Sequence, residues 1–434
     1  MIKSISLLKH YSLHNGPKRS LISDDARPYS IVYENNREFE ELMLSLFLID
    51  KYYPSESNFS LGVSRKKDFN DVKGDVEQLY AFLTNRKITI KIVPIHRCHT
   101  EQQRLVASAW GSSNRGVPCL FSGGLDSTAG ALLLIKSQLA PILSHTITGN
   151  IVFGRVCKLM KNPALRDLSL IATEMRTVAA DSSPVMTRGL LFLSNAMVLA
   201  SSMGHRQIFV PENGPLMINP HVSPLADPTK NAHPYLLTTL ERIYNQLTQA
   251  KVNIKPIFKD ATKADLIRKI RGAENVINQT WSCFKIQGQA RMCGICFACL
   301  VRRLSAIAAG YKEPPGTYQF DAFRIRRQAL GASLITDLDI LYDTLIYLEK
   351  ILKDDSFVAS ELSMLPSNFF EDKIRLIRNF SLDMFLGIRG YLQTEGENNL
   401  GPLGRFSRKI LREVPESELM LRENDLDSGS YCQR

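Results

Sequence analysis

Seven consecutive residues, Ser122 to Thr128, read Ser-Gly-Gly-Leu-Asp-Ser-Thr and carry the groups that a phosphate-binding loop needs. They follow a short apolar run, Val117 to Phe121, and precede a helix-favouring stretch, which predicts a strand, a tight loop and a helix. Two glycines allow the backbone to approach an anion closely, while hydroxyl groups and the helix N-terminus supply donors and partial positive charge. The expected ligand is a pyrophosphate group.

Asp126 sits inside this predicted anion site, where phosphate would repel it unless a cation lay between them, so we assign it to Mg²⁺. The plainer alternative is a Ser/Gly turn in which Asp126 to Thr128 cap a helix. If the loop binds ATP, the predicted contacts are Phe121, Ser122, Gly123, Gly124, Leu125, Asp126, Ser127 and Thr128.

Four of the eight cysteines fall within seventeen residues and have the spacing of metal ligands. Two overlapping Cys-x-x-Cys steps place adjacent thiolates around one tight turn, which Gly294 would relieve, and a fourth thiolate closes a tetrahedron. Four protein ligands leave no open position for water, so the prediction is a structural zinc site; an iron–sulfur cluster and redox thiols are the alternatives. The predicted ligands are Cys283, Cys293, Cys296 and Cys299.

The composition is that of a globular protein, with 434 residues, 44% hydrophobic and 22% charged. No stretch approaches the roughly 18 apolar residues of a membrane span, and we expect a cytoplasmic protein without a membrane partner. The net charge of +11 is compatible with nucleotides or acidic partners. Because the basic residues are dispersed, a solvated surface is favoured over a nucleic-acid site.

The helices and strands that must position these residues are predicted to form three parts of the chain. Residues 1–110 combine strand-like runs at 30–33 and 88–94 with a helical stretch at 39–53, which predicts an α+β extension. Residues 111–315 alternate apolar strand-like runs with amphipathic helices, which predicts an α/β domain with a parallel sheet and helices on both faces. Residues 316–434 follow a Pro-Pro-Gly break and are expected to be mainly helical.

Six leucines between Leu334 and Leu352 recur at spacings of three and four residues, which predicts one helix with an apolar stripe. Packing onto the core domain and a partner helix are the two interpretations. Residues 413–434 are polar and are expected to be loose. His96, Cys98 and His99 lie close in sequence without a fourth ligand nearby, so a strand end is favoured there over a metal site.

The string SGGLDST resembles the signature of the PP-loop ATP pyrophosphatases, the fold class of adenine nucleotide alpha hydrolase-like proteins. The cysteine block, together with Thr280-Trp281-Ser282 before it and Arg302 after it, resembles the zinc-binding tail of the QueC family of 7-cyano-7-deazaguanine synthases. Two further blocks resemble that family in the same order: residues 188–196, with Arg188 and Phe192-Leu193-Ser194, and residues 262–267, with Lys263.

The resemblance implies an ATP-dependent ligase. ATP would adenylate the carboxylate of 7-carboxy-7-deazaguanine, giving an acyl-AMP that an amine attacks, with AMP and pyrophosphate released. It implies three catalytic residues, Asp126 at Mg²⁺, Lys263 at the phosphates and Arg188 as a second cation, with a structural ion pair as the alternative for Arg188. The implied cofactors are structural Zn²⁺, Mg²⁺ and ATP as co-substrate.

The sequence departs from the family at its substrate segment. After the apolar run 207–210 this chain reads Pro-Glu-Asn-Gly, and Glu212 and Asn213 are the predicted substrate contacts. A carboxylate at Glu212 pairs well with the two N–H donors of a guanine-like base, or else bonds local backbone.

The flanking extensions resemble in layout the QueC-like proteins of bacterial anti-phage defence systems of the Qat type. That resemblance implies a partner protein's amine as acyl acceptor. The alternatives are a free synthase that uses ammonia, a tRNA-modifying enzyme on the same loop, and a nucleotide-binding scaffold without catalysis.

Overall fold

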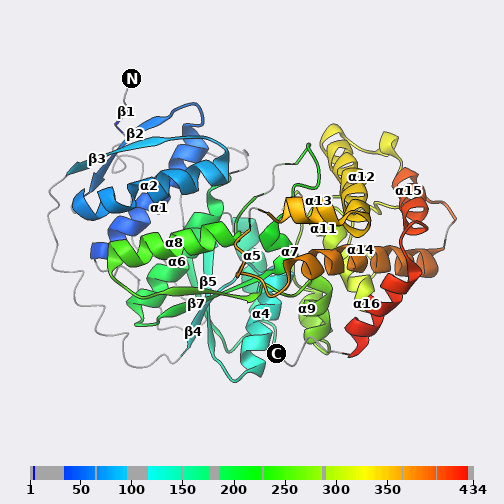
Figure 1. Ribbon diagram of the computed structural model, residues 1–434. Helices are drawn as coiled ribbons and strands as arrows, with labels where there is room; N and C mark the ends of the chain where they lie inside the picture. Colours follow the sequence, from blue (N-terminus) through cyan, green and yellow to red (C-terminus); the bar gives the residue numbers. More distant parts are fainter. Residues whose placement is uncertain are drawn as a thin grey trace. The chain divides into compact units, whose positions relative to one another are not determined.

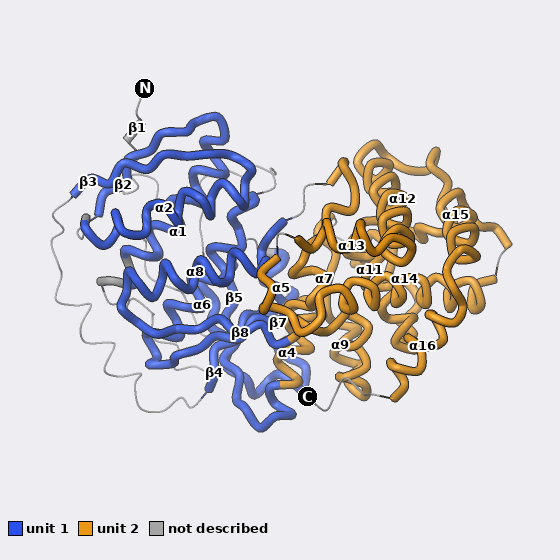
Figure 2. The backbone as a smooth tube through the Cα atoms, viewed as in Figure 1, with its two compact units in different colours: residues 1–122, 134–211, 229–257 blue, residues 123–133, 212–228, 258–434 orange. Residues whose placement is uncertain are grey.

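The computed structural model describes residues 3–4, 34–63, 66–94, 116–147, 150–174, 185–226, 229–285, 290–363, 365–396 and 398–428. The chain divides into two compact units (Figure 2): residues 1–122, 134–211 and 229–257 form the first, and residues 123–133, 212–228 and 258–434 form the second. The division of the sequence at residues 110 and 315 into three domains stays a prediction. None of the described helices is both long and apolar enough to cross a bilayer.

The first unit begins with a small parallel sheet in the order β1-β2-β3. Helix α1 packs on this sheet through Leu42, Leu46 and Ile49, which face Phe59 and Ile90, as the apolar spacing predicts. The predicted strand at 30–33 and the group His96, Cys98 and His99 lie outside the described residues. The elements, drawn in blue in Figure 1, are β1 (Lys3–Ser4), α1 (Glu34–Tyr52), β2 (Asn58–Val63), α2 (Lys66–Thr84) and β3 (Thr89–Pro94).

The larger sheet has five strands in the order β6-β5-β4-β7-β8. Residues 141–147 of β5 are all buried, as expected of a parallel strand that is covered on both faces. The α/β fold with a parallel sheet flanked by helices is therefore confirmed. Its strands are β4 (Val117–Leu120), β5 (Pro141–Ile147), β6 (Ser169–Glu174), β7 (Gln207–Asn213) and β8 (Asn253–Phe258), and helices of this part of the chain are α4 (Leu125–Lys136), α5 (Asn150–Leu159), α6 (Arg188–Ser202) and α8 (Pro234–Thr248).

The strand order reverses once. The chain runs from the central strand β4 to β5 and β6 on one side, and then returns to β7 and β8 on the other side. In doubly wound α/β sheets, ligands bind beyond the carboxyl ends of the strands at such a reversal. Three sequence blocks lie at the carboxyl ends of β4, β7 and β8. The glycine loop (residues 122–128) follows β4, the Glu212 segment (residues 211–214) includes the last residues of β7, and the Lys263 block (residues 262–267) comes shortly after β8.

The second unit is mainly helical beyond β8. Five of the six leucines, from Leu338 to Leu352, lie on the buried face of α12. This helix packs within the chain, but more against α14 and α15 of residues 316–434 than against α11 of the predicted core domain. The mainly helical nature of this C-terminal part is confirmed for the described residues between 316 and 428. The helices, coloured from green to red in Figure 1, are α7 (Gly214–Ile218), α9 (Lys263–Lys269), α10 (Glu274–Ile277), α11 (Phe297–Ala308), α12 (Ala332–Lys353), α13 (Asp355–Glu361), α14 (Lys373–Glu395), α15 (Pro402–Leu411) and α16 (Glu416–Ser428).

The expectation of a loose segment from residue 413 onward is wrong for the part that the structure describes, which ends at residue 428. Helix α16 buries Leu419, Arg422 and Leu426, which lie on one face at helical spacing. This face packs against α14 and α9. Two leucines and an arginine in a polar segment give too weak an apolar pattern for a sequence-based prediction.

Candidate active site and metal centre

The glycine loop has the predicted order of strand, turn and helix. Gly123 has a φ of 76°, which a residue with a side chain rarely adopts, and α4 begins at Leu125. The first turn of α4 closes on Gly124, whose carbonyl oxygen accepts hydrogen bonds from the Thr128 amide at 3.0 Å and the Ser127 hydroxyl at 3.0 Å. This turn presents the helix N-terminus directly after the glycines.

Asp126 and Lys263 meet, although they are 137 residues apart in sequence. Lys263 Nζ lies 2.5 Å from Asp126 Oδ1, and Asn213 Nδ2 donates to Asp126 Oδ2 at 2.9 Å. The side chains of Lys263 and Asp126 are only 7% and 12% exposed. A lysine and a carboxylate that are both buried interact strongly, and either one would be costly to leave without the other.

Lys263 is held at the first position of α9. Its neighbours Thr262 and Asp265 form a capping box, in which the Thr262 amide donates to Asp265 Oδ2 at 2.8 Å and the Asp265 amide donates to Thr262 Oγ1 at 3.3 Å. The residue between them therefore has a fixed backbone and projects its ammonium group toward Asp126.

Asn213 ends β7 and caps α7, because its Oδ1 accepts a hydrogen bond from the Leu216 amide at 3.2 Å. The segment before α9 passes very close: a Cβ added to Gly214 would lie 2.0 Å from the Lys259 carbonyl oxygen. The Gly214 amide also donates to the Ala261 carbonyl oxygen at 3.0 Å. This close backbone approach brings the Glu212 segment and the Lys263 block together.

Glu212 completes this cluster. Its Oε1 accepts a hydrogen bond from Asn213 Nδ2 at 3.4 Å. Desolvation raises the pKa of the Glu212 carboxyl well above its ordinary value, the negative charge of Asp126 raises it further, and Lys263 opposes both effects. The structure thus brings together Asp126, Lys263, Glu212 and Asn213 in the second unit.

Three further predicted site residues, Arg188, Phe121 and Ser122, belong to the first unit, and their part in the site stays a prediction. Arg188 is exposed at the start of α6, and its guanidinium carbon lies 5.9 Å from the centre of the Phe192 ring. Phe121 is buried, and its carbonyl oxygen lies 2.8 Å from Nδ1 of His145.

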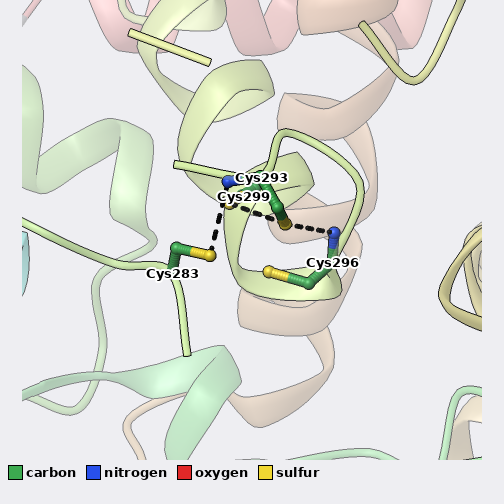
Figure 3. A group of neighbouring side chains, drawn as sticks. All are labelled: Cys283, Cys293, Cys296 and Cys299. Atoms are coloured by element: carbon green, nitrogen blue, oxygen red, sulfur yellow. Dashed lines mark hydrogen bonds between the residues drawn. The ribbon is translucent and has the colours of Figure 1, made fainter. Parts of the chain in front are cut away.

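The four cysteines converge on one point (Figure 3). Their sulfur atoms all lie within 4.8 Å of one another, and the side chains are at most 4% exposed. Cys293 Sγ and Cys299 Sγ are 3.8 Å apart, which is the edge expected for a tetrahedron of zinc–sulfur bonds of about 2.3 Å. Among the residues that the structure describes, this is the one group of three or more such ligands that could hold a metal.

Backbone donors support ionised sulfur at this centre. The amides of Ile295 and Cys296 point at Cys293 Sγ from 3.4 and 3.3 Å, and the Cys293 amide points at Cys283 Sγ from 3.4 Å. A filled set of four soft donors fits structural zinc, which would tie the loop at Cys283 to the start of α11.

Gly294 is required by this metal-binding turn. Its φ is 80°, and a Cβ added there would lie 2.0 Å from the Phe320 carbonyl oxygen. We expect Gly294→Ala to shift the turn, to lower the zinc content of the purified protein to well below one ion per chain, and to lower the melting temperature. Gly272→Ala is the control, since Gly272 also has a positive φ but has open space around it. A Gly294→Ala protein with full zinc would contradict this account.

Comparisons with known proteins agree with these features. Residues 150–310 match the family described as Queuosine biosynthesis protein QueC. A 7-cyano-7-deazaguanine synthase of Thiobacillus denitrificans is 28% identical over 227 residues, covering 45% of this chain and 97% of that protein. The enzyme of the same name from Methanothrix thermoacetophila is 26% identical over 223 residues, covering 45% and 96%.

A third protein of that name, from an Azoarcus species, is 31% identical over 135 residues, which cover 30% of this chain and 55% of that protein. The matched residues 150–310 include the Glu212 segment, the Lys263 block and all four cysteines. Residues 150–310 of this chain are therefore similar to the QueC family, as the sequence motifs predict.

Proposed function

We propose that this protein uses ATP to adenylate the carboxylate of 7-carboxy-7-deazaguanine and transfers the acyl group to an amine. The observation that carries the proposal is the buried pair of Lys263 and Asp126, 2.5 Å apart. Asp126 belongs to the sequence Ser-Gly-Gly-Leu-Asp-Ser-Thr, and Lys263 begins α9. The names of the similar proteins support the substrate class.

In the proposed reaction, a carboxylate oxygen attacks the α-phosphorus of ATP, and pyrophosphate leaves. The amine nitrogen then attacks the carbonyl carbon of the acyl-AMP, AMP leaves with the bonding electron pair, and the nitrogen loses a proton. Residues 121–128 would bind the nucleotide, and Lys263 would neutralise charge that develops on its phosphates. Arg188 is proposed as a second cation.

Mg²⁺ fits the donors of the cluster. Asp126 and Glu212 offer carboxylate oxygens, the ligands that Mg²⁺ prefers, and each oxygen of Asp126 keeps a lone pair beyond its contact with Lys263 or Asn213. Bound there, Mg²⁺ would neutralise phosphate charge. The protein's own part is to hold Asp126 in place by Lys263 and Asn213.

Glu212 and Asn213 are the proposed contacts to the deazaguanine base. Because the pKa of Glu212 is raised in the free protein, pairing of its carboxylate with two N–H donors would favour the ionised form and release a proton. We expect Glu212→Gln to raise the KM for the acid about 10- to 100-fold, since a hydrogen-bonded charge is lost, with little change in the KM for ATP.

The proton release is measured by calorimetry of the binding of 7-carboxy-7-deazaguanine in two buffers that differ in ionisation enthalpy. It should vanish in Glu212→Gln. Asn219→Asp is a control with a changed charge beyond α7, and the release should persist in that variant. An unchanged KM for the acid in Glu212→Gln would exclude the proposed contact.

The acceptor amine is proposed to belong to a partner protein, in an anti-phage defence system. The support is that the QueC-like part covers under half of the chain, and that the helical extension is an ordered part of the second unit. A free synthase that uses ammonia is the second candidate, because the similar proteins bear that name.

Mass spectrometry of a reaction with Mg·ATP and 7-carboxy-7-deazaguanine separates these candidates. A mass increase on a protein encoded beside this one supports the protein acceptor, whereas an amide or nitrile formed only with ammonia supports the free synthase. AMP without any deazaguanine product would refute the substrate assignment. Absence of pyrophosphate under all these conditions would favour a nucleotide-binding scaffold.

A further inference from the structure

A buried charged cluster lies behind Lys263. Four side chains form it: Thr262 and Asp265 at the start of α9, Asp383 in the middle of α14, and Arg422 in α16. All four residues are at least 94% buried. Asp383 and Arg422 come from the helical extension, outside residues 150–310 that match the QueC family.

The contacts within the cluster are direct. Arg422 Nε donates to Asp383 Oδ1 at 2.8 Å, and Arg422 Nη2 donates to Asp265 Oδ1 at 2.8 Å. The Thr262 hydroxyl donates to Asp383 Oδ2 at 2.5 Å. Each member of the capping box around Lys263 is therefore bonded to the extension, Thr262 through Asp383 and Asp265 through Arg422.

The other end of α9 is also held by α16. Arg268 Nη1 donates to the Leu426 carbonyl oxygen at 2.8 Å and pairs with Asp427 at 2.5 Å. The two helices thus meet both at the Lys263 end of α9 and one turn further on. The seven-residue α9 is too short to be stable by itself, so such contacts must fix its direction.

Burial of these charged groups costs free energy of desolvation. Two carboxylates share one guanidinium without solvent, and removal of Arg422 would leave both without that partner. Burial raises the pKa of Asp383, and the adjacent Arg422 opposes this shift. Apolar side chains could fill the same space without the free-energy cost of burying charged groups. Packing of the helices alone therefore does not require this charged cluster.

We infer that Arg422 and Asp383 are positioning residues for Lys263: the extension acts through the capping box to fix the ammonium group at Asp126. This inference rests on the proposed function for its catalytic consequence. Its structural part is independent of any activity. The extension would then be an integral part of the adenylating site.

The main test is a pair of variants with matched chemistry. Arg422→Met removes the cluster arginine, whereas Arg389→Met removes an arginine that also joins α14 to α16, through ion pairs with the exposed Glu416 and Glu423 at 2.6 and 2.5 Å. We expect Arg422→Met to lower the rate of AMP formation about 100-fold at saturating ATP, as a shift of about 1 Å at a reacting group does, and Arg389→Met to lower it less than threefold.

A third variant separates position from stability. The double variant Arg422→Met/Asp383→Leu replaces the ion pair of these two residues by apolar groups. It should recover part of the melting temperature lost in Arg422→Met, because Asp265 alone then lacks the guanidinium. Its rate should stay low if the cluster positions Lys263. Combined with Lys263→Met, Arg422→Met should cost no further rate, because both variants remove the same interaction. A rate that recovers together with the melting temperature would overturn the inference.

Hydrogen exchange measures the positioning without turnover. Peptides that cover residues 262–266 should lose protection in Arg422→Met and in the double variant, and keep it in Arg389→Met. Unchanged protection in Arg422→Met would overturn the inference even if the rate of AMP formation falls in that variant. If the unmodified protein forms no AMP, the proposed function fails, and the exchange result still decides whether the extension holds α9.

Discussion

Replacement of Asp126 by asparagine is expected to reduce the release of AMP and pyrophosphate about 100- to 1,000-fold. The change keeps the size of the side chain but removes the charge that pairs with Lys263 at 2.5 Å and that is proposed to hold Mg²⁺. Lys263 would then keep a buried ammonium group without its carboxylate partner. Release of pyrophosphate at saturating Mg·ATP and acid measures the effect.

Asp260→Asn is the matched control for this experiment. Asp260 pairs with Lys259 at 2.9 Å, three residues before the Asp126 partner, but both side chains are about one-third exposed. We expect its rate to stay within a factor of two of the unmodified protein, because such pairs contribute little. An undiminished rate in Asp126→Asn, at an unchanged melting temperature, would remove Asp126 from the mechanism.

Replacement of Cys296 by serine is expected to remove the metal and a large part of the folding stability. The four sulfur atoms surround one point, and the cysteines are only 0 to 4% exposed. A serine hydroxyl in place of one thiolate would leave the metal with an incomplete ligand set and would bury a polar group. Structural zinc contributes on the order of 10 kcal/mol in small zinc domains. If a third of that energy is lost, the melting temperature is expected to fall by about 7 to 13 °C, because 1 kcal/mol shifts it by about 2 to 4 °C in a folding unit of 150–250 residues.

Metal analysis and thermal unfolding should change together in Cys296→Ser. Cys157→Ser is the control, because Cys157 is a partly buried cysteine outside the cluster, and this variant should keep both the metal and the melting temperature. A Cys296→Ser protein that lacks metal but unfolds at the original temperature would show that the site is not structural.

The features that the sequence predicted correctly are those with local signals. The loop after β4 has two adjacent glycines and a helix start, so its order of strand, turn and helix follows from neighbouring residues. The cysteine cluster follows from spacing, because Cys293, Cys296 and Cys299 lie on one turn and the start of one helix. The leucine stripe of α12 is local in the same sense.

The features that were missed depend on contacts between distant segments. No local sequence pattern predicts the hydrogen bond from Asn213 to Asp126. The same holds for the contacts of Thr262 with Asp383 and Arg422, which lie 121 and 160 residues further along the chain. Arg422 lies in a polar helix with few apolar residues, and its burial is possible only because Asp265 and Asp383 neutralise it. Tertiary charge pairing of this kind leaves no periodic signal.

The most direct test of the central claim is an isotope transfer. The protein is incubated with Mg·ATP, an amine source and 7-carboxy-7-deazaguanine that carries ¹⁸O in its carboxylate, and the AMP is analysed by mass spectrometry. If the carboxylate oxygen attacks the α-phosphorus, one ¹⁸O atom passes to each AMP formed, and Asp126→Asn and Lys263→Met reduce the labelled product by about 100-fold or more. AMP that carries oxygen from water instead would show hydrolysis of ATP and would contradict adenylation of the acid.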